Sequence, residues 1–211
     1  LEEMREMVTV SGMVVHDGRA VPGTNIYYSR LNVYSFRQNI VEHGSTTRKD
    51  GSFEFKIHAS ELPVHIVAFN LDYAINWIPL TDENNLNGIR LELGLSDMLS
   101  GYVRTDEDIP IEGAEISVSG IVRDNDFNGR ISNSKLVGVM STTDANGFFS
   151  LNNLPKNSRV SLQLLAKGYE KGATSENSNV LRDIEISVRP EGRIAGRVIY
   201  DKTGKPASGL M

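Results

Sequence analysis

Side-chain oxygens recur at alternate positions in residues 124–129, which read Asp-Asn-Asp-Phe-Asn-Gly. Oxygen ligands at positions 1, 3 and 5, followed by a Gly at which the chain bends, form the first half of a calcium-binding loop. The three ligand positions are Asp124, Asp126 and Asn128. Position 12 is Lys135, where such a loop needs a carboxylate that binds with both oxygens. A polar turn is therefore the favoured interpretation, and calcium is the one cofactor candidate in a chain otherwise expected to hold none.

Residues for zinc binding or nucleophilic catalysis do not occur in the required patterns. The four histidines show no spacing that would place two ligands on one helical face, and they are His16, His43, His58 and His65. We expect these imidazoles to face solvent. The chain has no cysteine, and no serine lies in a Gly-x-Ser-x-Gly turn. The sequence therefore predicts no catalytic residue and a protein that is not an enzyme.

Aromatic side chains are the candidates for a binding surface. Tyr34, Phe36 and Trp77 could stack on sugar rings or anchor a protein partner if they are exposed. Two long segments, residues 29–45 and 120–139, would form the rest of that surface. Trp77 has an equally good second interpretation, as a packing residue of the first domain.

The composition indicates an ordinary globular chain. Of 211 residues, 39% are hydrophobic and 23% charged, and the net charge is -5. Lys and Arg are not clustered as binding to a phosphate backbone requires, so nucleic acid is not an expected partner. No apolar run approaches the ~20 residues that cross a bilayer, so membrane insertion is not expected. The chain has the look of a piece of a longer protein.

Two sequence patterns recur along the chain. Gly-x-Val occurs at residues 12–14, 101–103 and 196–198, and Thr-x-x-Asp/Asn-Gly-x-Phe occurs at 47–53 and 143–149. The spacing is kept as well, because Leu93 to Gly101 and Val188 to Gly196 are both 8 residues. Conserved spacing between turn residues predicts an internal duplication.

The predicted fold class is all-β, with tandem antiparallel Greek-key β-sandwiches of the transthyretin-like or Ig-like kind. Short alternating segments separated by turns support this class, and helical periodicity is almost absent. The predicted division is a lead-in or linker at 1–7, sandwiches at 8–95 and 96–189, and the start of a third, truncated repeat at 190–211. Because the linker near residue 96 is short, we expect the sandwiches to stack end to end as a semi-rigid rod.

The chain resembles the carboxypeptidase regulatory-like domain family, the transthyretin-like β-sandwich module. The resemblance rests on the two recurring patterns above, on Pro-x-x-Gly-Ala at 110–114 and on Ala-x-Gly-Tyr at 166–169. The first domain departs from it, with Ala20 at the Pro position and Leu71-Asp72-Tyr73 at the Lys-Gly-Tyr corner. The resemblance implies an accessory module of an exported bacterial protein, located outside the cytoplasm in the periplasm, on the cell surface or in the medium.

The expected function is a non-catalytic structural or spacer module that positions neighbouring domains of the same polypeptide. The alternative is a module that binds a glycan or protein ligand through the two long segments and the aromatic side chains.

Overall fold

The first half of the chain forms two β-sheets that face each other. The computed structural model describes residues 6–30, 41–82, 85–123, 130–132, 139–177, 183–192 and 200. One sheet consists of β2 (Arg19–Ala20), β1 (Met7–His16) and β5 (Ser52–His58), with β8 (Ile89–Glu92) also paired to β1. The other has the order β4 (Val41–Thr46), β3 (Asn25–Arg30), β6 (Val64–Phe69) and β7 (Asn76–Leu80). A 3-10 turn, η1 (Ala59–Glu61), connects β5 to β6.

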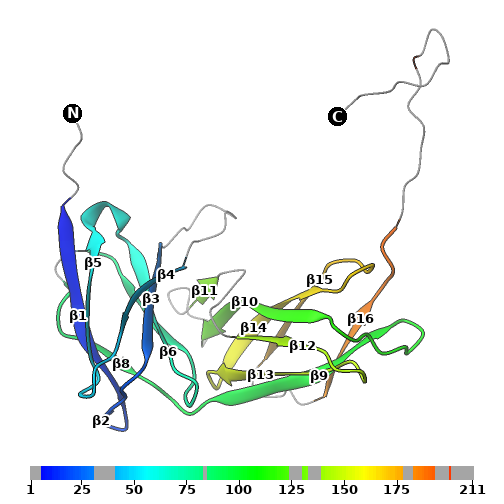
Figure 1. Ribbon diagram of the computed structural model, residues 1–211, viewed down its shortest axis with the longest axis horizontal. Helices are drawn as coiled ribbons and strands as arrows, with labels where there is room; N and C mark the ends of the chain where they lie inside the picture. Colours follow the sequence, from blue (N-terminus) through cyan, green and yellow to red (C-terminus); the bar gives the residue numbers. More distant parts are fainter. Residues whose placement is uncertain are drawn as a thin grey trace.

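The second half also forms two sheets, but they have three and five strands, whereas the sheets of the first half have four each (Figure 1). One sheet has the order β13 (Phe148–Leu154), β9 (Asp97–Thr105) and β16 (Ile184–Val188). The other has the order β11 (Arg130–Ser132), β10 (Glu115–Arg123), β14 (Ser158–Leu165) and β15 (Gly172–Asn177), with β12 (Met140–Thr142) also paired to β10. The prediction of an all-β sandwich fold is confirmed.

One strand pair in each half departs from the predicted antiparallel pattern. β8 runs parallel to β1, with Gly12 opposite Ile89, and β16 runs parallel to β9, with Gly101 opposite Ile184. A Cβ on either glycine would lie 2.2 Å from the carbonyl oxygen of the opposite isoleucine. The missing side chain therefore lets the parallel strands approach, which explains the glycine in each Gly-x-Val pattern.

The turns that lead into β5 and into β13 are built in the same way. Gly51 and Gly147 adopt φ of 77° and 76°, a conformation that favours glycine. The buried hydroxyls of Thr47 and Thr143 each accept a hydrogen bond from a backbone N–H and donate one to a backbone carbonyl. The predicted tight turns at these positions are confirmed.

Each sandwich encloses a hydrophobic core, but the second core also includes residues of the first half. The first cluster draws all its buried members from the first half, among them Val10, Val14, Phe53 and Ile66. The second contains residues such as Phe149 and Leu162, and four more from β6, β7 and the corner between them. These four are Val67, Phe69, Ile75 and Trp77.

These four residues show how the sandwiches are joined. Val64, Ile66 and Ala68 of β6 face the first core, while the alternate residues Val67 and Phe69 face the second sandwich. The near end of the second sandwich thus packs against the outer face of the sheet β4-β3-β6-β7, and its strands run across those of the first (Figure 1). The expectation of an end-to-end stack is therefore wrong, because the second sandwich uses a sheet face of the first.

Within the described residues, the structure contains no helix long and apolar enough to span a bilayer.

Candidate functional site

The predicted site residues fall into two groups. Asp124, Asp126 and Asn128 of the calcium candidate lie outside the described residues, as do Tyr34 and Phe36 of the aromatic surface. Trp77 lies on β7 and is 0% exposed. It is therefore not an exposed binding aromatic, because the second sandwich covers the face on which its ring lies. It is a packing residue, as its second interpretation expected, but its ring packs in the core of the second sandwich and not in that of the first domain.

The expectation that all four imidazoles face solvent is wrong for His65. Its side chain lies on the outer face of β6, opposite Ser29 on β3 and Pro79 on β7, and is 7% exposed. Val67 and Phe69, which lie on the same face of β6 as His65, belong to the core cluster of the second sandwich, so this face of the strand is covered. In the described part of the chain, no three His, Asp or Glu side chains are grouped so that they could hold a metal ion.

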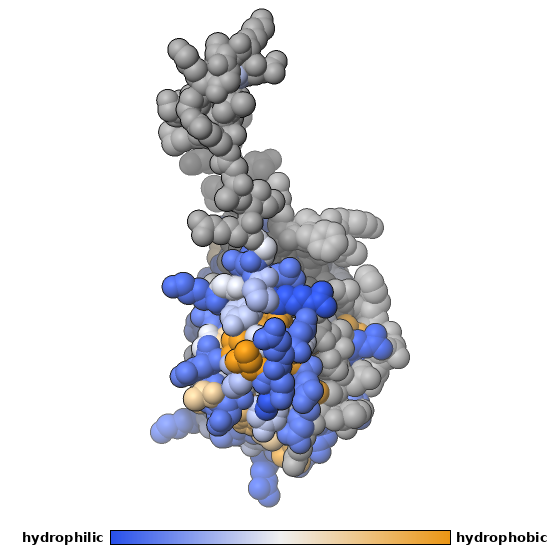
Figure 2. All heavy atoms as spheres, turned by 90° about the vertical axis from the view of Figure 1, so that its right-hand side faces the viewer, coloured by the Kyte–Doolittle hydropathy of each residue, from blue (hydrophilic) through white to orange (hydrophobic). Residues whose placement is uncertain are grey.

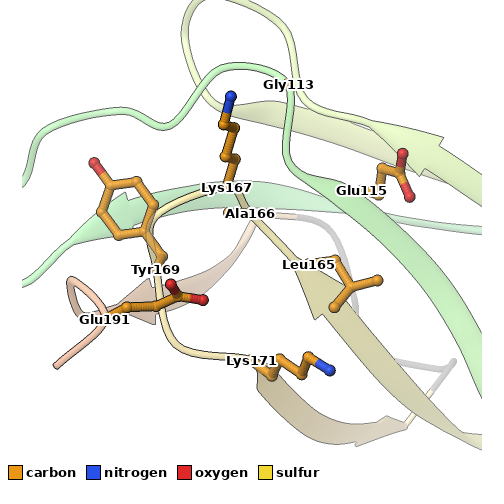
Figure 3. Close-up of a pocket in the computed structure, with 8 residues that line it drawn as sticks. All are labelled: Gly113, Glu115, Leu165, Ala166, Lys167, Tyr169, Lys171 and Glu191. Carbon is orange, nitrogen blue, oxygen red and sulfur yellow. The ribbon is translucent and has the colours of Figure 1, made fainter. Parts of the chain in front are cut away.

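A shallow hollow lies on the second sandwich, at the ends of β10 and β14. It is lined by Gly113, Glu115, Leu165, Ala166, Lys167, Tyr169, Lys171 and Glu191. Figure 3 shows the charged ends of Lys167 and Lys171 pointing in different directions, so they do not converge on one ligand. Figure 2 looks at the end of the molecule away from the first sandwich, where the surface is mostly hydrophilic around a small apolar area.

The junction between the sandwiches is the site at which functional side chains converge. Its centre is Arg123, at the end of β10, whose guanidinium Cζ lies 3.8 Å from the centre of the Trp77 ring. Nη2 of Arg123 donates a 2.7 Å hydrogen bond to the carbonyl oxygen of Trp77, and Nη1 donates one to Oδ1 of Asn76. A planar cation that stacks on an indole and donates two hydrogen bonds fixes both position and orientation.

Asn153 forms a second contact across the junction. Its side-chain Nδ2 donates to the carbonyl oxygens of Asn70, Leu71 and Tyr73, at 3.1, 2.8 and 2.9 Å. The backbone carbonyl oxygen of Asn153 accepts a 2.8 Å hydrogen bond from the backbone N–H of Ile75. Residue 153 has φ of 64°, a left-handed conformation that Asn tolerates better than most residues. One residue of β13 therefore holds the whole corner between β6 and β7.

Buried polar groups mark the same junction. Nε1 of Trp77 and Nε2 of His65 are buried without a hydrogen-bond partner among the described residues. Burial, with a smaller contribution from the positive charge of Arg123, lowers the pKa of His65 to about 4. The imidazole is thus neutral at pH 7 and lies within range of the charge of Arg123.

The chemistry of this site is that of an internal interface. Stacking, hydrogen bonds to backbone carbonyls and buried apolar side chains all act between the two sandwiches. Their combined effect is to set the orientation of one sandwich relative to the other.

Asn153→Asp is expected to lower the free energy of unfolding by about 3 kcal/mol, because a buried carboxylate would face three carbonyl oxygens that now accept hydrogen bonds. Asn153→Gly keeps the left-handed backbone and loses only the amide, so a loss of about 1–2 kcal/mol is expected. Urea unfolding measures both. Asp183→Gly is the control for the backbone, since Asp183 is exposed and also left-handed. Equal losses at 153 and 183 would contradict the assigned role of the Asn153 amide.

Neither Arg123 nor Asn153 was a sequence-based candidate. Arg123 belongs to a long segment between recognisable turns, and Asn153 lies where β13 departs from regular pairing, between Leu151 and Leu154. The one available signal was the nearly unbroken apolar run of β6, in which His65 is the single polar residue. Such a run indicates a strand buried on both faces, and hence something packed against its outer face.

No family model and no curated protein matches the chain. Among solved structures, it is similar to the shaft pilin SpaA from Lactobacillus rhamnosus GG, with 13% identity, 90% of this chain and 100% of that chain covered, and a TM-score of 0.37. It is also similar to a streptococcal ancillary pilin, with 11% identity, 90% and 64% covered, and a TM-score of 0.36. A third is the pilus backbone RrgB from Streptococcus pneumoniae, with 11% identity, 83% and 58% covered, and a TM-score of 0.29. At these TM-scores the likeness carries no activity, ligand or partner over to this chain.

Proposed function

We propose that this chain is a non-catalytic structural module that holds neighbouring domains of an exported bacterial protein at a fixed spacing and orientation. The junction is the observation that supports this proposal. A flexible connection would need only the short linker, whereas here Trp77, Arg123 and Asn153 add a buried stack and directed hydrogen bonds. Relative motion of the sandwiches would break all of them together.

The proposal includes an internal duplication and membership of the carboxypeptidase regulatory-like family. Supporting features are the close glycine approach at Gly12 and Gly101 and the buried threonine at Thr47 and Thr143. Isolated bridges also recur, between Tyr73 and Leu95 and between Tyr169 and Pro190. The boundaries at 8–95 and 96–189, the third repeat at 190–211 and the extracytoplasmic location belong to the same proposal.

The alternative, a module that binds a glycan or protein ligand, has lost its best candidate because Trp77 is buried. Tyr34 and Phe36 lie outside the described residues, and no observation on the described residues favours this alternative. The calcium candidate at Asp124, Asp126 and Asn128 stays a prediction.

Residual dipolar couplings at pH 7.5 test the proposed rigidity. Amide groups of both sandwiches are expected to fit one alignment tensor, with the crossed arrangement of Figure 1. The double variant Arg123→Ala/Asn153→Gly is expected to give two distinct tensors, because both contacts across the junction are removed. Arg90→Ala is the control, since Arg90 is exposed and pairs only with Glu92 in the described part of the chain. Two distinct tensors in the unmodified protein would refute the proposal.

A further inference from the structure

We propose that the junction is acid-sensitive, so that protonation of His65 favours separation of the second sandwich from the sheet face of the first. This inference rests on the proposed function, because it concerns the regulation of the same junction. It is carried by the position of one buried imidazole, on the face of β6 that the second sandwich covers, near the half-buried guanidinium of Arg123.

The position of His65 follows from the register of its sheet. Its neighbours in sequence, Val64 and Ile66, face the first core, so the imidazole faces the second sandwich. Directly opposite it are Ser29 on β3 and Pro79 on β7, neither of which carries a charge. The first half of the chain thus offers no counter-ion at these two positions.

The other titratable groups on the neighbouring strands face away or are engaged. Arg30, the next residue on β3, alternates to the opposite face of the sheet from Ser29 and lies 3.8 Å from Glu61 in an ion pair. Farther along the face, the rings of Tyr27 and His43 pack edge to face with centres 5.4 Å apart. Among the described residues of the second sandwich, Arg123 is the charged group whose field acts on His65.

Arg123 cannot withdraw from His65 while the junction stays closed. Its guanidinium is held by the ring of Trp77, by the carbonyl of Trp77 and by the side chain of Asn76. A protonated His65 would therefore be a second cation in a site of low polarity, beside a first one that is fixed. Opening the junction would hydrate both cations, so proton uptake and opening favour each other.

The direction of the pH dependence follows from the two protonation equilibria. In the closed junction the pKa of His65 is about 4, against 6.5 for an exposed imidazole. Between these values the open form binds a proton that the closed form does not bind. The ratio of closed to open forms therefore falls as the pH falls from about 6.5 towards 4, and the expected decrease by pH 4.5 is on the order of 10²-fold.

The chain carries a built-in probe of this equilibrium. Trp77 is its single tryptophan, and it lies in the junction itself. Urea titrations followed by Trp77 fluorescence at pH 7.5 and pH 4.5 give the ratio of closed to open forms at each pH. Carboxylates also titrate near pH 4.5, so the result is read as a difference between variants.

His65→Gln is expected to lose about 10²-fold of the pH dependence, because the glutamine side chain does not take up a proton. His43→Gln is the matched control, a histidine on the same sheet, and it should keep the dependence of the unmodified protein. Equal pH dependence in the unmodified protein and in His65→Gln would overturn the proposal.

A second measurement does not depend on how well the variant folds. Ring resonances of the unmodified protein, assigned by the four single His→Gln variants, report the titration of His65 directly. Titration below pH 5 in the closed protein is expected, and titration near pH 6.5 would overturn the proposal. Failure of the proposed function would instead appear as two alignment tensors at pH 7.5, where His65 is neutral in both forms.

Discussion

Trp77→Ala is expected to lower the free energy of unfolding by about 3–5 kcal/mol, measured by urea denaturation and followed by circular dichroism. The indole is 0% exposed and contributes to the core cluster of the second sandwich although it belongs to the first half. Its removal leaves a cavity and also removes the ring on which Arg123 stacks. The second sandwich should lose stability and its attachment to β7 should weaken, because the ring packs in the second core while its backbone belongs to the first sandwich.

Two comparisons separate the junction from general loss of packing. Tyr102→Ala removes a half-buried ring that packs on Phe148 within the second sandwich, and a loss of about 1 kcal/mol is expected. Trp77→Phe keeps an aromatic face for Arg123 and should retain a single alignment tensor, whereas Trp77→Ala should not. A loss below 1 kcal/mol for Trp77→Ala would mean that the junction contributes little to stability.

In the first half, the strands that could be predicted from the sequence were those with the clearest alternation of apolar residues. β5 presents Phe53, Phe55 and Ile57 on one face, as their alternation required, and all three are buried. Asp50-Gly51 predicted the turn that precedes β5, because Gly51 can adopt positive φ at little cost. Strand alternation and turn conformation are set by neighbouring residues in the sequence, so they can be predicted without knowing which other elements pack against the strand.

β7 and the parallel pairs could not be predicted from local patterns. β7 is five residues long and includes Pro79, which cannot donate a hydrogen bond to the sheet, so the segment resembled a corner. The direction in which β8 pairs with β1 is set by how the chain crosses the sandwich, and the residues of β8 alternate equally well for either direction.

The junction shows the limit of sequence reasoning most clearly. All six residues of β6 are buried, whereas β14 at the equivalent position alternates between buried residues and half-buried ones such as Ser161 and Gln163. The sequence of β6 indicated this difference, because it is a nearly unbroken apolar run with His65 as its one polar residue. What packs against this side of the first sandwich could not be read from the sequence, because Arg123 and Asn153 lie far along the chain from β7 and from the corner before it, and contact them only in the folded structure.

Gly101→Ala is expected to lower the free energy of unfolding by about 3 kcal/mol, at the upper end of the usual cost of overpacking. The backbone of Gly101 is not left-handed, so the cost comes from space and not from conformation. The new Cβ would lie 2.2 Å from the carbonyl oxygen of Ile184 and 2.5 Å from its Cγ1. A backbone carbonyl in a paired strand cannot turn aside as a flexible side chain would, so β16 must move away from β9.

The chain offers a replicate and a control for this substitution. Gly12→Ala places a Cβ 2.2 Å from the carbonyl oxygen of Ile89 and should cost about as much, because β8 and β1 approach in the same way. Gly94→Ala meets no atom within 4 Å and should change stability by less than about 0.5 kcal/mol. Amide hydrogen exchange should show lost protection in β16 for Gly101→Ala and in β8 for Gly12→Ala. If both variants were as stable as Gly94→Ala, the parallel pairing at these two glycines would be wrong, and with it the arrangement of one sheet in each sandwich.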